Sequence, residues 1–194
     1  MAAKLIPTPS QTVGPFFHIG LARPEWSDLT ARHPQGERIA IEGRVLDGDG
    51  VAVPDALVEL WQANAAGRYN HPDDTQEDKP LDPNFRGYGR SATDGDGRYR
   101  FVTIKPGPVP GRGNTLQAPH VNLAIFARGT LKQLYTRVYF AEEAGNRNDP
   151  LLSSIDDAAA RKTLIATRDG ATTPPTYRFD IVLQGEGETV FLDI

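Results

Sequence analysis

Hydrophobic and polar residues alternate in a series of short segments spread over most of the chain. Because successive side chains of a β-strand point to opposite faces, this pattern predicts half-buried strands. Glycine- and proline-rich sequences separate the segments, and the DGDG sequences at 47–50 and 94–97 predict tight hairpin turns. The predicted strands are Arg38 to Leu46, Ala56 to Ala63, Arg98 to Ile104, His120 to Ala127, Gln133 to Phe140, Tyr177 to Gln184 and Thr189 to Asp193. Many short strands joined by turns predict an all-β fold, a β-sandwich with long loops.

Only residues 153–166 have a pattern that predicts a helix. Ser153 or Ser154 can cap its start, and Arg161 and Lys162 lie toward its end, where positive charge interacts favourably with the helix dipole. At 194 residues the chain is long enough for one substantial core, so we expect a single domain over residues 1–194.

Residues 1–20 predict an extended arm, because Pro7, Pro9 and Pro15 fix the backbone and remove amide donors. A segment with much apolar surface is expected to dock on another surface. Two hypotheses stay open: the arm packs on its own domain, or it crosses to a partner subunit. The apolar residues of the arm are Leu5, Ile6, Val13, Phe16, Phe17 and Ile19.

Composition excludes several classes of function. The chain has no cysteine, which excludes disulfides and thiolate chemistry and fits a reducing cytoplasm. Its net charge of −4 argues against nucleic acid or an anionic membrane as the main partner. No run approaches the ~20 apolar residues of a membrane span, and no nucleotide-binding or common hydrolase motif occurs.

The segment 105–127 holds the most suggestive polar pattern. His120 and Asn122 are two residues apart on a predicted strand and therefore share a face. The polar loop 64–83, with Tyr69, His71, Asp73 and Asp74, could approach them, and long loops often carry function. A lone histidine is more often an ordinary core or edge residue, and spacing alone assembles no metal site here.

Arg128 and Arg137 are the remaining candidates for chemistry. Arg128 ends the strand of His120, and Arg137 lies within the largely apolar sequence LYTRVYF. The ordinary interpretation of each is an ion pair at the sheet edge or a side chain that extends to solvent. The alternative is recognition of an anionic group, since a guanidinium binds a carboxylate through two parallel hydrogen bonds.

Several longer motifs carry a resemblance to a known family, the intradiol ring-cleaving dioxygenases. The resemblance covers nearly the whole chain in matching order. It implies a β-sandwich core and a non-haem ferric iron held by two tyrosines and two histidines. The motifs are TPSQTVGPFFHIG (8–20), VELWQANAAGRYNH (58–71), LDPNFRGYGRSATDGDGRYRFVTIKPGP (81–108), PHVNLAIFARG (119–129) and GEGETVFLDI (185–194).

The resemblance also places the family's iron ligands on this chain, and two are missing. Tyr69 in GRY matches the first tyrosine, whereas Val109 after KPGP stands in place of the second. His120 matches the first histidine, Asn122 replaces the second, and Gln117 stands where the family has an arginine. Valine has no donor atom and an amide is a weak substitute for imidazole, so we expect no iron on this chain.

These gaps resemble the iron-free subunit of a two-subunit member of the family. That resemblance implies that an iron-bearing beta subunit binds Fe(III) and that the isolated chain is inactive. The complex would cleave 3,4-dihydroxybenzoate with O₂ and would assemble into a larger hetero-oligomer. On this hypothesis Thr12, Gly14 and Pro15 of the arm reach over the partner's pocket. Arg128 is the first candidate to bind the substrate carboxylate and Arg137 the second.

Two other hypotheses compete with this one. The first is an enzyme complete in itself that uses other ligands, such as His71 or an acidic residue of 73–78. The second is a non-enzymatic, transthyretin-like sandwich that binds a ligand.

Overall fold

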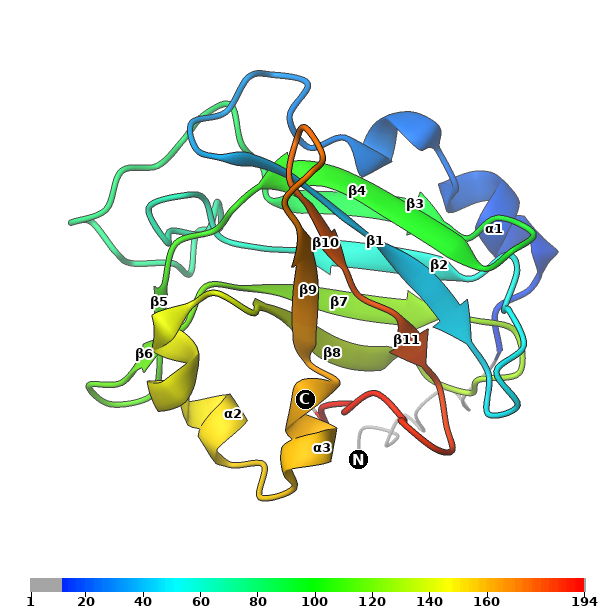
Figure 1. The fold of residues 1–194 in the computed structure, drawn as a ribbon. Coiled ribbons are helices and arrows are strands. Elements are labelled where there is room, and N and C mark those ends of the chain that lie inside the picture. Colours follow the sequence, from blue (N-terminus) through cyan, green and yellow to red (C-terminus); the bar gives the residue numbers. More distant parts are fainter. Residues whose placement is uncertain (1–11, 194) are drawn as a thin grey trace, which may run out of the picture.

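The computed structural model describes residues 12–193, and Figure 1 shows their arrangement. The longer strands lie where alternation predicted them, and the loop 64–83 contains no helix or strand. The strands are β1 (Arg38–Leu46), β2 (Leu57–Trp61), β3 (Tyr88–Ala92), β4 (Arg98–Ile104), β5 (Val109–Pro110), β6 (Leu116–Gln117), β7 (His120–Phe126), β8 (Leu134–Phe140), β9 (Ile165–Asp169), β10 (Thr176–Arg178) and β11 (Ile181–Val182). The helices are α1 (Pro15–Leu21), α2 (Pro150–Ser153) and α3 (Ala158–Lys162), with 3₁₀ turns η1 (Pro24–Ser27) and η2 (Ala144–Asn148).

Within residues 12–193, nine strands form one nearly closed sheet that folds into two layers. One layer is built on β1, which pairs antiparallel with β4 along one edge and parallel with β10 and β11 along the other. The other layer is the antiparallel run β3, β2, β7 and β8. β9 joins the two, because it pairs with β10 on one side and with β8 on the other. The prediction of an all-β fold is therefore confirmed.

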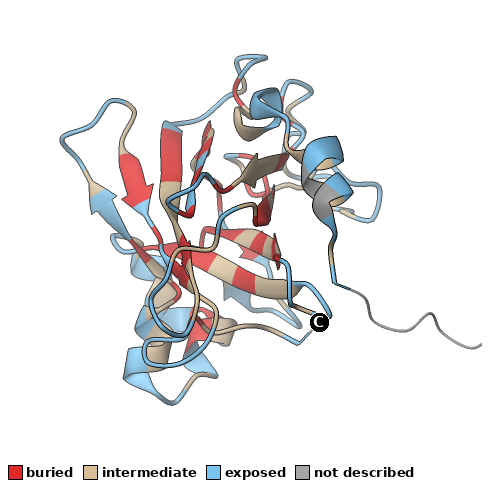
Figure 2. Ribbon diagram, turned by 90° about the vertical axis from the view of Figure 1, so that its right-hand side faces the viewer, coloured by how far each residue is buried: buried red, intermediate tan, exposed pale blue. Residues whose placement is uncertain are grey.

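The hydrophobic core fills the space between the layers. Ile41 and Phe101 from the β1 layer and Leu60 and Leu123 from the other layer are almost completely buried. Figure 2 shows buried residues concentrated on the strands, with most of the turns and helices exposed. Each of these positions points inward because of the period-two alternation that also marks it in the sequence.

The two DGDG sequences both form turns, but only the first closes a local antiparallel contact, the isolated bridge between Leu46 and Ala52. The turn at 94–97 connects β3 to β4, yet β3 pairs with β2 and β4 pairs with β1. This turn therefore carries the chain from one layer to the other. The hairpin interpretation of this turn is wrong, because both strands find their hydrogen-bond partners elsewhere.

The predicted strand Tyr177 to Gln184 is interrupted in its middle. Phe179 N–H donates to the carbonyl of Glu42, and Asp180 Oδ1 accepts from Arg44 N–H, so the chain bulges between β10 and β11. Gly43 makes the bulge possible, since a Cβ there would lie 1.8 Å from the Phe179 carbonyl oxygen. The strand predicted over 189–193 is also wrong, because only an isolated bridge between Tyr135 and Leu192 forms there.

The single helix predicted over 153–166 is instead two short helices and the start of a strand. Asp149 accepts from the amides of Leu151 and Leu152 and begins α2 before the predicted start. Ser154 is the C-cap of α2 and not the N-cap that was predicted, and Asp157 is the N-cap of α3. Two aspartate caps within nine positions divide the segment, and Ile165 already belongs to β9.

The described part of the arm is helical from Pro15 onward, where an extended segment was predicted. Residues 1–11, with Leu5 and Ile6, lie outside the described part of the chain, but Pro15 is the first residue of α1. Proline suits the first helical turn, because its fixed φ is helical and its missing N–H has no partner there in any case. The ring of Phe17 packs 5.2 Å from that of Phe126 at the end of β7, so this part of the arm docks on its own domain.

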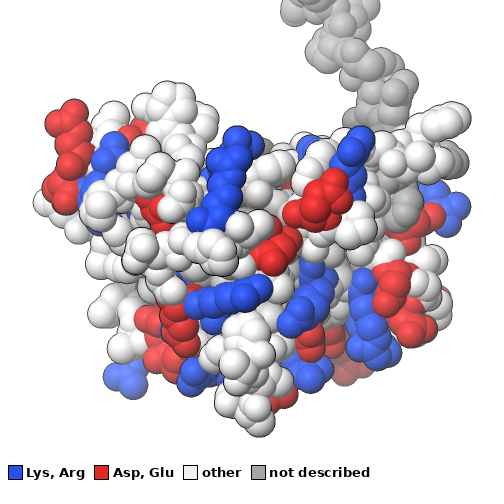
Figure 3. All heavy atoms as spheres, turned by 90° about the horizontal axis from the view of Figure 1, so that it is seen from above, with Lys and Arg blue, Asp and Glu red and all other residues white. Residues whose placement is uncertain are grey.

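Charged side chains of both signs lie on the surface of the molecule. On the face seen from above in Figure 3, basic and acidic residues are interspersed, and no extended basic field is present on it. Elsewhere in the described structure, side chains of opposite charge also pair, for example Arg100 with Glu42 and Arg168 with Glu37. Among residues 12–193, no helix has the length and apolar character needed to cross a bilayer.

Candidate functional site

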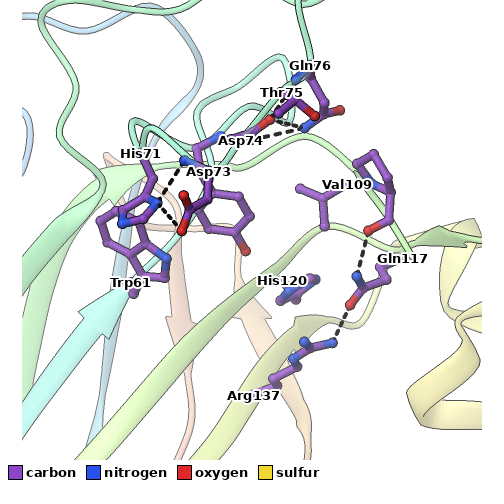
Figure 4. A pocket seen from close by; sticks show the side chains of 12 residues that line it. Trp61, His71, Asp73, Asp74, Thr75, Gln76, Val109, Gln117, His120 and Arg137 are labelled. Carbon is purple, nitrogen blue, oxygen red and sulfur yellow. Dashed lines mark hydrogen bonds and ion pairs between the residues drawn. The ribbon is translucent and has the colours of Figure 1, made fainter. Parts of the chain in front are cut away.

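A cavity of about 630 Å³ opens where β7 begins, between the loop 64–83 and the turn that follows KPGP. Figure 4 shows side chains from these segments converging on it, with His120 and Arg137 at its floor. The segment 105–127 and the polar loop therefore do come together, as the sequence suggested. The lining residues are Trp61, Tyr69, His71, Asp73, Asp74, Thr75, Gln76, Val109, Pro110, Gln117, His120 and Arg137.

The loop is held against the KPGP turn by close backbone contacts. Asn64 Oδ1 accepts from the amides of Ala66 and Arg68, which tightens the chain just before Tyr69. Gly67 adopts φ +81°, and a Cβ there would lie 2.0 Å from the Pro108 carbonyl oxygen. This approach, which only glycine permits, places Tyr69 and Val109 on the walls of one cavity.

The four positions that the family resemblance marks do gather here. Asn122 Nδ2 donates to the Tyr69 hydroxyl at 3.2 Å, and His120 lies two residues away on the same strand. Val109 is almost fully buried, and its side chain faces the cavity in Figure 4. The frame of a metal site is present, and its chemistry depends on which donor atoms remain.

His120 keeps the orientation of a metal-binding histidine. Its Nδ1–H donates to the Ala118 carbonyl at 2.8 Å, since a carbonyl can only accept, and this leaves the Nε2 lone pair free. Burial, together with the positive charge of Arg137, lowers the pKa of His120 to about 4. The ring is therefore neutral at physiological pH.

Arg137 is the centre of a hydrogen-bonded network that the sequence did not reveal. It lies opposite Asn122 in the β7–β8 pair, and its Nε–H donates to Asn122 Oδ1 at 2.9 Å. One Nη1–H donates to Gln117 Oε1 at 2.6 Å, and Gln117 is fixed in turn by its own bond to the Pro110 carbonyl. The opposing register of Arg137 and Asn122 could have been inferred by folding the sequence about the turn at 128–130. The Gln117 contact had no such signal.

The residues present do not fit a ferric ion. Val109 has no donor atom, and the side-chain oxygen of Asn122 already accepts from the guanidinium of Arg137. Burial raises the pKa of Tyr69, against smaller lowering effects of Asn122 and Arg137, so its phenol stays protonated. A positive charge among the ligand positions also opposes a second cation. These four positions therefore lack the anionic donor set that Fe(III) requires.

Of the alternative metal ligands, His71, Asp73 and Asp74 are engaged in other contacts. His71 Nδ1 lies 3.6 Å from Asp73 Oδ2, and the His71 ring packs edge-on against Trp61. The carboxylate of Asp74 accepts hydrogen bonds from the backbone amides of Tyr69 and Gln76. Over residues 12–193 no group of three histidine or acidic side chains could hold a metal ion. The described part of the chain thus offers no support for an enzyme complete in itself.

Arg128 and the arm form a second cluster, at the opposite end of β7. Arg128 Nη2 pairs with Asp55 Oδ2 at 3.1 Å and remains largely exposed. Thr12 Oγ1 accepts from Gly129 N–H at 2.8 Å, and Gly14 is exposed just before Pro15 begins α1. At ~3.3 Å per residue, β7 puts this cluster about 20 Å from His120. Of the predicted substrate-binding residues, the structure thus groups four together and places Arg137 in the cavity.

The fold and the cavity together define a class: a β-sandwich with the frame of a metal site from which donor atoms are missing. The chain matches the family model described as "Dioxygenase" over residues 14–185. It belongs to the intradiol dioxygenase family, whose members use non-haem iron, and the predicted family is confirmed.

Curated relatives share the full length of the chain. It is 42% identical to the protocatechuate 3,4-dioxygenase alpha chain of Pseudomonas putida, over 100% of both chains. Identity to the alpha chain of Burkholderia cepacia is 40%, over 96% of this chain and 97% of the other. The beta chain from B. cepacia is 45% identical over 80% of this chain and 68% of its own length. This chain thus shares its family with both kinds of subunit.

Solved structures show the same fold. The dioxygenase domain of a carbohydrate-binding fusion protein from Streptomyces sp. SirexAA-E superposes with a TM-score of 0.62 at 26% identity, covering 93% of this chain and 99% of the other. The 3-chlorocatechol 1,2-dioxygenase of Rhodococcus opacus 1CP gives 0.64 at 22% identity, covering 84% of this chain and 66% of its own, and supports the fold alone.

Proposed function

We propose that this chain is the iron-free alpha subunit of a protocatechuate 3,4-dioxygenase and acts together with an iron-bearing beta subunit. The observation that carries the proposal is the Arg137–Asn122 contact within a chain that matches alpha chains over its whole length. A family member that cannot hold iron needs a partner that does. In the complex, the iron of the beta subunit supplies the oxygen chemistry.

The reaction is cleavage of the ring of 3,4-dihydroxybenzoate between its two hydroxylated carbons. That carbon–carbon bond breaks, both atoms of O₂ enter the product, and each former hydroxylated carbon becomes a carboxylate, giving 3-carboxy-cis,cis-muconate. The part of this chain in the reaction is to bind and orient: it completes the pocket wall, excludes water and presents a cation to the substrate carboxylate.

The arm cluster is the surface that suits this role. Phe16 is 85% exposed, Ile19 70% and Leu131 64%, a degree of exposure that favours burial against a partner. Thr12, Gly14 and Pro15 belong to the same end of the molecule. The docking of Phe17 on Phe126 keeps this segment on its own domain while its outer side faces away. The two hypotheses for the arm are thus compatible.

Arg128 is the residue we assign to the substrate carboxylate. It is largely exposed, it lies beside the arm, and its pair with Asp55 is open to solvent and therefore weak. When substrate binds, Arg128 exchanges the exposed carboxylate of Asp55 for that of the substrate, so little interaction energy is lost. Arg137 is the weaker candidate, because two of its nitrogens are already engaged with Gln117 and Asn122.

Co-expression with a candidate beta chain tests the proposal. We expect a stable complex that contains iron and cleaves the ring, with no activity from this chain alone and no iron bound to it. Iron in the isolated chain with the colour of a tyrosinate–iron complex would refute the proposal, and so would failure to form a complex with any beta chain that matches it in the same genome.

A further inference from the structure

The guanidinium of Arg137 carries a charge that no carboxylate contacts within the described residues. Its hydrogen bonds go to the uncharged acceptors of Asn122, Gln117 and Tyr139, and Nη2 has no partner among residues 12–193. Asp149 is connected to the guanidinium only through the Tyr139 hydroxyl, which donates to Asp149 Oδ1 at 3.0 Å. A half-buried cation of this kind, open to a cavity, favours an anion beside it.

Asp149 cannot turn toward the cavity to supply that anion. It is fully buried, and its carboxylate accepts from three backbone amides in addition to the Tyr139 hydroxyl. The amide donors are those of Ala118, Leu151 and Leu152. These bonds fix Asp149 as the cap of α2, so its carboxylate is not free to pair with Nη2 of Arg137, whose side chain lines the cavity.

The walls of the cavity suit a flat apolar ring. The rings of Trp61 and Tyr69 stack with centroids 5.5 Å apart and planes 20° from parallel. Val109 and Pro110 form another part of the lining, and in Figure 4 Val109 and Trp61 lie on different sides of it. The volume of about 630 Å³ falls within the range of small-molecule sites, which are apolar pockets with a few fixed polar groups.

The acidic residues of the cavity limit the charge of its ligand. Asp73 lies near His71, and Asp74 is held by Tyr69 N–H and by Gln76. Both carboxylates line the same cavity as Arg137. Their negative charges repel a compact dianion such as phosphate more strongly than they repel a ligand with one carboxylate. The aromatic ring of such a ligand separates its carboxylate from Asp73 and Asp74.

We propose that this cavity is a binding site for a small aromatic carboxylate of the benzoate class, with the carboxylate on Arg137 Nη2 and the ring between the Trp61 and Val109 walls. No bond is made or broken there, because the pocket holds no metal-ligand set and no activated nucleophile. The site lies within this chain, so this proposal can be tested independently of the proposed complex with a beta subunit.

Tryptophan fluorescence of the full chain tests the proposal directly. The chain has two tryptophans, and Trp26→Phe leaves Trp61 in the cavity wall as the sole reporter. In this background we expect saturable quenching by benzoate, at least about tenfold weaker binding of catechol, which lacks the carboxylate, and equally weak binding of inorganic phosphate.

Two variants separate a site in this cavity from binding elsewhere. Arg137→Met should weaken benzoate binding by about tenfold or more, whereas Arg98→Met, which removes an exposed charge outside the cavity, should leave it unchanged. Val109→Phe leaves the hydrogen-bond network in place and fills the cavity, so it should also abolish binding even if Arg137→Met fails to fold. Absence of quenching, equal binding of phosphate, or full binding by the Val109→Phe variant would overturn the proposal.

Discussion

Arg137 lies directly opposite Asn122 across β7 and β8, and its Nε–H donates to the amide oxygen of Asn122 at 2.9 Å. This bond takes the oxygen that a metal ion would need and brings a positive charge to the same place. A metal ion and the guanidinium therefore compete for one position. The charge of Arg137 therefore opposes a metal ion at this site, in addition to the missing donor atoms.

Restoring the donors alone should consequently fail to restore an iron site. We expect Val109→Tyr with Asn122→His to retain several-fold less ferric iron than the same pair combined with Arg137→Met, because the guanidinium repels a second cation. Iron content after desalting and visible tyrosinate absorption measure the difference. Equal loading of the double and triple variants would show that the charge of Arg137 does not oppose the metal.

The role assigned to Arg128 predicts a change in substrate affinity. In the reconstituted complex, Arg128→Ala should raise KM for protocatechuate by about tenfold through loss of a charge-assisted hydrogen bond, with a smaller effect on kcat. Steady-state kinetics check this, and Asp55→Asn is the matched control. It breaks the same ion pair but keeps the guanidinium, so KM should stay unchanged or fall. A rise in KM with Asp55→Asn would assign the effect to loss of the ion pair.

Local patterns predicted the parts of the fold that depend on local sequence. The bounds of β1 match its alternating segment at both ends, and the turn at 128–130 joins β7 to β8 as expected. The parallel pairing of β1 with β10 could not be predicted, because it joins residues more than a hundred positions apart, such as Ala40 and Thr176. The divided helix was missed because Asp149 and Asp157 were not recognised as caps.

Only part of the candidate site could be predicted from the sequence, because the rest depends on contacts between segments far apart in the chain. The alternation of β7 placed His120 and Asn122 on one face, and the resemblance added Tyr69 and Val109. The Arg137 network depends on Gln117, which reaches it from a two-residue strand paired with Val109 and Pro110. No periodicity marks so short a strand, so the contact becomes visible only in three dimensions.

His120 predicts a specific pH dependence of stability. Its ordinary pKa is 6.5, and burial, with the charge of Arg137, lowers it to about 4 in the folded chain. Above pH 6.5 both states are neutral at this residue, and between pH 6.5 and 4 the unfolded chain binds the proton first. As the pH is lowered through this range, the contribution of His120 to the free energy of unfolding should therefore decrease by about 1.4 kcal/mol per pH unit. The total decrease is about 3 kcal/mol.

Urea unfolding of the wild type and of His120→Gln at a series of pH values measures this contribution. Glutamine keeps a donor for the Ala118 carbonyl but does not titrate. The stability difference between the two proteins should be constant above pH 6.5 and shift in favour of the variant as the pH falls toward 4. Parallel curves over the whole range would show that His120 is not held neutral by the fold.

Asp149 predicts the largest loss of stability among the helix caps. It is fully buried and accepts from Ala118 N–H, two amides of α2 and the Tyr139 hydroxyl, so Asp149→Ala leaves several buried donors without a partner. We expect a loss of about 2–4 kcal/mol in the free energy of unfolding. Asp157→Ala, which removes a single exposed cap bond to Ala159 N–H, should cost only about 1 kcal/mol.

Chemical denaturation of the two cap variants makes the comparison, with the wild type as reference. The same Asp149 variant removes the carboxylate that balances Arg137 through Tyr139. Benzoate, if it binds the guanidinium, should therefore raise the free energy of unfolding of Asp149→Ala at least as much as that of the wild type, because the ligand replaces part of the lost negative charge. Equal losses for the two caps would show that Asp149 acts only as a helix cap, with no further contribution from its buried contacts to Ala118 and Tyr139.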